Sequence, residues 1–153
     1  MTTQIRSIGD LVVVRNAAGP AAALAGGAGD AAAVTGTIID RAALGWPQSA
    51  VVCLPYTATL AEAKTLSIAS VIQHGAESDL SDADTLATVA SGVQATGGSG
   101  GSTEAGQVEV NVSLAGAARY VRVNFTPDLS ATGTDIARVA AVVVLGGATR
   151  LPQ

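Results

Sequence analysis

The residues best suited to chemistry are the single cysteine, Cys53, and the single histidine, His74. A nucleophilic thiol or hydroxyl needs a neighbouring base and a carboxylate that orients this base. Asp79 lies near His74 in the sequence, but no nucleophile motif surrounds either residue. We therefore predict that the chain is not an enzyme. We expect Cys53 to be a small buried hydrophobic residue and His74 to lie on the surface at a strand end.

An acidic segment follows His74 and offers oxygen atoms of the kind that calcium prefers. Its carboxylates are Glu77, Asp79, Asp82 and Asp84. The segment lacks the ligand order of an EF-hand loop and the bidentate glutamate that completes it. Clusters of like charge more often mark solvated turns, so we interpret this segment as a turn and predict no bound metal.

Two glycine-rich segments resemble phosphate-binding loops only in part. Residues 97–101 contain four glycines, but no lysine follows them in the P-loop pattern. Residues 27–32 imitate part of a dinucleotide fingerprint without the strand that should precede it. We therefore predict that the chain binds no cofactor.

The elements that position these residues read as β-strands. Residues 107–114 alternate valine or leucine with polar side chains, and residues 120–126 repeat this alternation. A period of two is typical of a strand with one buried and one wet face. The run 136–145 loses this alternation, since residues 139–144 are all apolar, which predicts a strand covered on both faces by its own domain or by a partner. Three such strands in succession predict a meander.

This meander should form the core of the domain. The side chains that we expect to be buried are Val121, Val123, Val143 and Leu145. Further strand-like runs precede it, at residues 34–39, 50–59, 66–73 and 86–94, the last of which also fits a short helix. Turn residues separate all these short runs, which predicts an all-β domain, either a β-sandwich or a jelly roll.

The beginning of the chain has a different composition. Residues 1–33 are rich in alanine and glycine, and only residues 11–15 resemble a short strand. Glycines and Pro20 interrupt every helical window. Such a segment buries too little surface to become ordered alone. We predict an extended arm over residues 1–33 that becomes ordered on a partner, followed by a β-sandwich domain over residues 34–153.

Composition limits the partners. The net charge is −4, and the chain lacks the clustered positive side chains that bind nucleic acid. No apolar run is long enough for a membrane helix. Aromatic residues make up only 3% of the chain, so the core must be built from aliphatic side chains that bury little area each. We therefore expect self-association to add to the stability of the folded chain. The predicted partner interface consists of Leu11, Val12, Val13, Val14, Val139, Val142 and Val144.

Several segments resemble small structural proteins of tailed bacteriophages, namely capsid decoration or cement proteins. They are residues 36–41 (GTIIDR), 49–52 (SAVV), 58–61 (ATLA), 119–123 (RYVRV), 141–147 (AVVVLGG) and 150–152 (RLP). The resemblance implies a β-rich protein on the exterior of the capsid, bound to the major capsid protein and commonly trimeric. It implies no catalytic residues.

Residues 119–123 are also similar to a strand of discoidin-like, galactose-binding β-sandwiches. This second resemblance implies a carbohydrate-binding or host-adhesion module on the virion. Sugar sites usually need exposed aromatic rings for stacking, and the chain has only one Trp, two Tyr and one Phe. A virion tail component is the third alternative.

Overall fold

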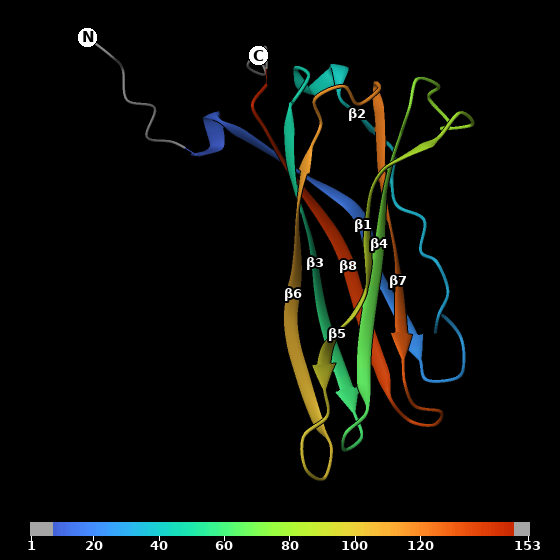
Figure 1. Ribbon diagram of the computed structural model, residues 1–153. Helices are drawn as coiled ribbons and strands as arrows, with labels where there is room; N and C mark the ends of the chain where they lie inside the picture. Colours follow the sequence, from blue (N-terminus) through green and yellow to red (C-terminus); the bar gives the residue numbers. More distant parts are fainter. Residues whose placement is uncertain (1–7, 149–153) are drawn as a thin grey trace.

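In the part of the chain that the structure describes, eight antiparallel strands form two four-stranded sheets that face each other across an apolar core (Figure 1). The structure, a computed structural model, describes residues 8–148. Sheet A contains, in spatial order, β1 (Val12–Leu24), β8 (Ile136–Gly146), β3 (Ser49–Leu60) and β6 (Ser102–Ser113). Sheet B contains β2 (Ile39–Asp40), β7 (Tyr120–Leu129), β4 (Thr65–Gly75) and β5 (Asp84–Thr96). Two short 3-10 helices, η1 (Ile8–Asp10) and η2 (Ala42–Leu44), complete the described elements. The prediction of an all-β sandwich is confirmed.

The strand pairing is that of a jelly roll. Pairs form between β1 and β8, β2 and β7, β3 and β6, and β4 and β5, as in one long hairpin wound into a sandwich. Contacts of β8 with β3 and of β7 with β4 complete the two sheets. The predicted meander is therefore wrong, because β6, β7 and β8 alternate between the sheets. Side-chain alternation shows which face of a strand is buried but does not identify the neighbouring strand.

The core is aliphatic, as composition requires. Val121, Val123, Val143 and Leu145 are each at most 4% exposed, which confirms the four predicted core positions. Phe125 is buried beside them on β7. The segment that also fitted a short helix, residues 86–94, lies within the strand β5.

The predicted arm requires a correction, because β1 belongs to the sandwich. It pairs with β8 along its whole length and contributes Ala17, Ala18 and Ala23 to the core. Alanines give close contact to the opposite sheet, and register shifts after Asn16 and Ala18 accommodate the glycine and proline that follow. Tertiary pairing therefore overrides the weak local preference of this stretch. Deletion of residues 1–33 would remove a strand of sheet A; residues 1–7 lie outside the described range.

Residues 34–38 close one open side of the sandwich between β1 and β7. The Thr37 amide donates to the carbonyl of Ala17 at 2.6 Å, and Val34 forms a bridge with Phe125. The Gly36 amide donates to the Asn124 side-chain oxygen at 3.1 Å. This predicted strand is thus reduced to a bridge and the two residues of β2, because the Val34 amide bonds to Phe125 of β7 whereas the Thr37 amide bonds to Ala17 of β1 in the other sheet.

A buried arginine organises the connections at one end of the sandwich. Arg41 is only 2% exposed. Its guanidinium donates hydrogen bonds to the carbonyl oxygens of Pro47, Leu114 and Ala118 at 2.8–2.9 Å, and to the carbonyl oxygen of Ala117. Burial lowers the pKa of this guanidinium. Four carbonyls from two separate loops thus converge on one side chain.

Candidate interaction surface

The two residues best suited to catalysis lie in different sheets. Cys53 is on β3, with its side chain half-buried on the outer face of sheet A, so the expectation that it is fully buried is wrong. His74 is near the end of β4 in sheet B, where its Nδ1 accepts a hydrogen bond from the Ala118 amide at 2.9 Å. Burial and the charge of Glu109 raise the pKa of the Cys53 thiol. The structure therefore brings together no nucleophile and base from this pair.

The acidic segment uses its carboxylates to hold its own turn. Asp82 accepts hydrogen bonds from the amides of Ala76 and Glu77, and Asp79 accepts one from the amide of Ser81. These bonds lower the pKa values of both carboxyls. Within residues 8–148, no three acidic, histidine or cysteine side chains are placed to hold a metal ion.

The glycine-rich loop already contains a carboxylate. The Gly100 amide donates to Glu62 at 3.1 Å, and the Gly98 amide donates to the Ser102 hydroxyl at 2.7 Å. A phosphate would have to displace a negatively charged side chain here, so the loop has the properties of a structural turn.

The outer face of sheet A carries a group of aliphatic side chains that the sandwich does not cover. We call it the valine face, and it consists of Val12, Val14, Val51, Val142 and Val144. Val14 of β1 lies opposite Val144 of β8, which lies opposite Val51 of β3. On β3 and β8 the side chains that alternate with them are buried, namely Ala50, Val52, Ala141, Val143 and Leu145, because successive side chains of a strand face opposite ways.

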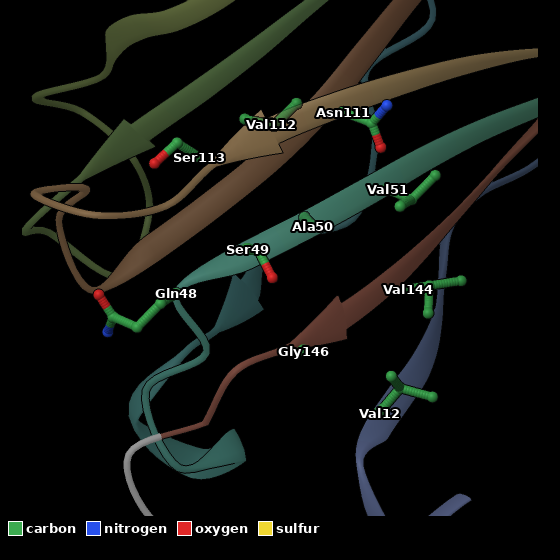
Figure 2. A pocket seen from close by; sticks show the side chains of 10 residues that line it. All are labelled: Val12, Gln48, Ser49, Ala50, Val51, Asn111, Val112, Ser113, Val144 and Gly146. Atoms are coloured by element: carbon green, nitrogen blue, oxygen red, sulfur yellow. The ribbon is translucent and has the colours of Figure 1, made fainter. Parts of the chain in front are cut away.

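A shallow hollow of about 430 Å³ lies on this face (Figure 2). Figure 2 shows Val12, Val144 and Val51 lining it from three adjacent strands, with Asn111 and Ser113 of β6 on its far side. The surface therefore changes from aliphatic at β1 and β8 to polar at β6. Aliphatic side chains that are gathered on one exposed face are typical of an interaction site.

The outer face of sheet B is different in character. Gln73 of β4 accepts hydrogen bonds from Arg122 at 2.8 Å and from Asn124 at 2.7 Å, both on β7. Such side chains are already bonded to one another and need no partner protein. The outer face of sheet A thus presents a group of valines, whereas that of sheet B presents this bonded polar group.

The predicted interface residues separate into three groups. Val12, Val14, Val142 and Val144 gather on the valine face, although they come from opposite ends of the sequence. Leu11 lies just before β1 and is exposed, and Val13 points toward the core.

Two residues depart from the sequence-based assignment. Val139 is 1% exposed in the core, so its inclusion in the interface is wrong. Val51 belongs to the valine face but was not predicted, because residues 50–54 form an unbroken apolar run that hides which side chains face outward.

Comparison with known proteins gives evidence on the fold. No family model matches the chain, and no curated protein matches its sequence. The structure is similar to the VP2 subviral particle of infectious bursal disease virus, with a TM-score of 0.52 and 12% identity over 92% of this chain and 33% of that one. It is also similar to T=1 particles derived from the same virus, with a TM-score of 0.51 and 13% identity over 92% of this chain and 32% of that one.

The chain therefore has a β-sandwich fold similar to that of a domain-sized part of these virus proteins. It spans about a third of the length of the virus proteins that it matches. At such low identity the likeness concerns the fold alone. In residues 8–148, no helix is long and apolar enough to cross a membrane.

Proposed function

We propose that the chain is a structural protein of a tailed-bacteriophage virion, a decoration or cement protein. It binds the outer surface of the major capsid protein lattice and stabilises the head. The observation that carries this proposal is the valine face, because an aliphatic patch on one side of a rigid sandwich is what a docking subunit needs. The jelly-roll topology and the likeness to virus-derived particles support a virion role.

The charge of the chain favours the capsid exterior. A subunit with a net charge of −4 would be repelled by packaged DNA if it lined the interior. Its partner on this reading is the major capsid protein, and it needs neither nucleic acid nor membrane.

Stabilisation of the head follows from mass action. A subunit that binds only the assembled lattice shifts the equilibrium toward that lattice, and many sites act together. The resemblance to decoration proteins implies a trimer, and we propose that copies of this chain associate on the head. No catalytic step or cofactor enters this role, so His74→Ala and Cys53→Ala should leave head binding intact.

Copy number and binding to heads test this function. We expect a copy number per particle comparable with that of the major capsid protein, distributed over the head in an electron-microscopy reconstruction. A few copies at the tail tip would contradict the proposal and favour a tail component.

A matched pair of substitutions tests the surface. Val51→Lys places a charge in the valine face, whereas Val71→Lys places the same charge on the outer face of sheet B, where Val71 is half-buried on β4. We expect Val51→Lys to abolish co-sedimentation with undecorated heads and Val71→Lys to retain it. Equal binding by both variants would contradict the assignment of the valine face. Glycan binding by the isolated protein without binding to heads would favour a carbohydrate-binding module.

A further inference from the structure

Open sheet edges are a second kind of interaction surface in this fold. An edge strand presents unpaired N–H and C=O groups that can pair with another chain, and proteins usually protect such edges. Sheet A ends in β1 and β6, and sheet B ends in β2 and β5.

Three of these four edges carry a protective feature. β6 carries Glu104 and Glu109, whose charges oppose pairing with another acidic chain. β5 departs from regular register with β4 at three places, which bends its edge. β2 has only two residues and leads through Arg41 into η2.

The fourth edge, β1, is protected along only part of its length. Beyond Asn16 it contains register shifts and Pro20, and the Ala17 carbonyl is occupied by the amide of Thr37. Residues 12–16 keep a regular register with β8 and contain neither proline nor a carboxylate. The Arg15 guanidinium donates to the Val14 carbonyl at 3.0 Å. This carbonyl is therefore reachable from the solvent side of the strand.

Exposed apolar side chains are concentrated around this open edge. Ile8 is 75% exposed, Leu11 is 46% exposed and Val14 is 55% exposed. Side chains of this size, next to an unprotected edge, add an apolar contribution to the backbone hydrogen bonds that a paired strand would form.

We propose that residues 12–16 pair with the same residues of a second copy of this chain. The strands run antiparallel about a two-fold axis at Val14, so that Val14 faces Val14 of the second copy. Two-fold contacts of this self-complementary kind are the commonest in homo-oligomers.

The side chains fit this register. Val12 lies opposite Asn16 of the second copy, and Val13 lies opposite Arg15, so no like charges face each other. Val14 exchanges both backbone hydrogen bonds with its equivalent, in the pattern of a hydrogen-bonded antiparallel pair. A second copy therefore suits this edge better than an acidic segment of β6, whose carboxylates would enter an aliphatic edge.

Pairing would join the valine faces of the two copies into one surface. The two-fold axis stands perpendicular to the sheet, so both faces point the same way and remain open to a further partner. This contact is independent of the proposed function, although a doubled surface would bind a lattice more tightly through two linked sites.

Oligomeric mass tests the contact. In sedimentation velocity at micromolar concentrations of the full chain, we expect a dimer for the wild type and a monomer for Val14→Lys, because an edge lysine opposes pairing. Val93→Lys is the matched control, since Val93 is 61% exposed on the edge strand β5, and it should remain dimeric. A monomeric or trimeric wild type, or a dimeric Val14→Lys variant, would overturn the proposal.

A disulfide tests the two-fold register directly. In a Cys53→Ala background, Val14→Cys places two thiols across the axis with Cα atoms about 5.5 Å apart, within the range of a disulfide. Mild oxidation should give a covalent dimer, whereas Val93→Cys in the same background should stay monomeric on a non-reducing gel. Equal cross-linking of the two variants, or none at position 14, would contradict the register. Head binding is measured separately, so failure of this contact and failure of the proposed function are distinguishable.

Discussion

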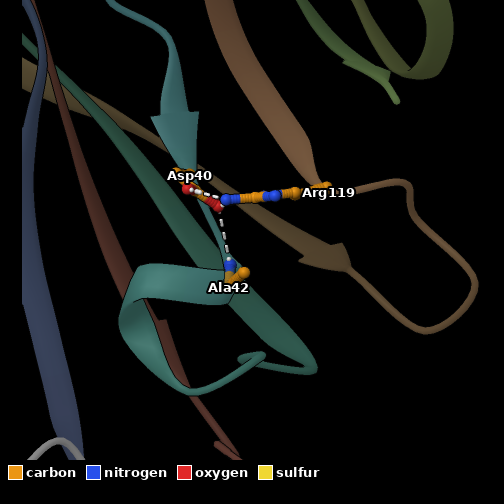
Figure 3. A network of polar contacts seen from close by, with 3 residues as sticks. All are labelled: Asp40, Ala42 and Arg119. Carbon is orange, nitrogen blue, oxygen red and sulfur yellow. Dashed lines mark hydrogen bonds and ion pairs between the residues drawn. The ribbon is translucent and has the colours of Figure 1, made fainter. Parts of the chain in front are cut away.

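Arg119 and Asp40 form a two-point ion pair that fastens the two-residue strand β2 to the start of β7 (Figure 3). Arg119 Nε lies 3.0 Å from Asp40 Oδ1, and Arg119 Nη2 lies 2.8 Å from Oδ2. The Ala42 amide donates to the same carboxylate at 2.9 Å, so Asp40 also fixes the start of η2. A single, partly exposed carboxylate thus holds the end of β2 against β7 and against the start of η2.

The first prediction concerns the pH dependence of this pair. The hydrogen bond from Arg119, and that from Ala42, lower the pKa of Asp40 in the folded protein. Its stabilising contribution is therefore present above the unfolded-state pKa and is lost as pH falls through the folded-state pKa. We expect Asp40→Asn to lower the melting temperature modestly at pH 7, since the pair is partly exposed. The difference from wild type should vanish in acid, well below about pH 4.

The control for this prediction is the same substitution in an Arg119→Gln background. Asp40→Asn should then change the melting temperature less at pH 7 than it does beside the native arginine. If Asp40→Asn lowers the melting temperature equally in both backgrounds, the ion pair with Arg119 does not account for the stabilising contribution of Asp40.

The second prediction concerns Arg41. Arg41→Ala leaves the carbonyls of Pro47, Leu114, Ala117 and Ala118 without their donor, and we expect a loss of about 3 kcal/mol or more in the free energy of unfolding. Arg41→Lys keeps the charge but not the planar fork, so it should restore only part of this loss.

Urea denaturation measures this change. Arg138→Lys on the exposed outer face of β8 is the matched control, and its effect should stay within about 0.5 kcal/mol. An Arg41→Ala variant as stable as wild type would show that the two loops need no common donor.

The third prediction compares two glycines. A Cβ on Gly36 would lie against the Val123 carbonyl and 2.7 Å from the Ala17 carbonyl, and backbone atoms cannot move aside easily. We expect Gly36→Ala to cost about 2–4 kcal/mol by forcing residues 34–38 away from the sandwich. Gly19→Ala, with nothing within 4 Å of the new Cβ, should be neutral or stabilising by up to about 1 kcal/mol. Equal stability of the two variants in urea would contradict the close approach at Gly36.

The fourth prediction concerns the reactivity of Cys53. Because burial and the charge of Glu109 raise its pKa, less thiolate is present at pH 8 and alkylation by iodoacetamide should be slower than for a free thiol. Glu109→Gln should accelerate alkylation in part, since burial remains. Glu104 lies opposite Ala58 on β3, whereas Glu109 lies opposite Cys53. The Glu104→Gln substitution should therefore leave the alkylation rate unchanged. A rate equal in all three proteins would exclude the electrostatic effect of Glu109.

The fold class and much of the core can be predicted from local patterns in the amino-acid sequence. A strand exposes its side chains alternately, so the period-two pattern of residues 120–126 was enough to place Val121 and Val123 inside. The same logic failed where both faces are apolar: Val139 and Val142 look alike in the sequence, yet one lies in the core and the other on the valine face.

The identity of neighbouring strands follows from the packing of the folded chain and not from local patterns. The alanines of β1 carry almost no local preference for a strand, and they become part of the sandwich because β8 pairs with them. The valine face likewise exists only after β1, β8 and β3 meet, although their residues are far apart along the chain. Alternation is a local property that each strand carries in its own sequence, whereas pairing between distant strands depends on the packing of the whole sandwich.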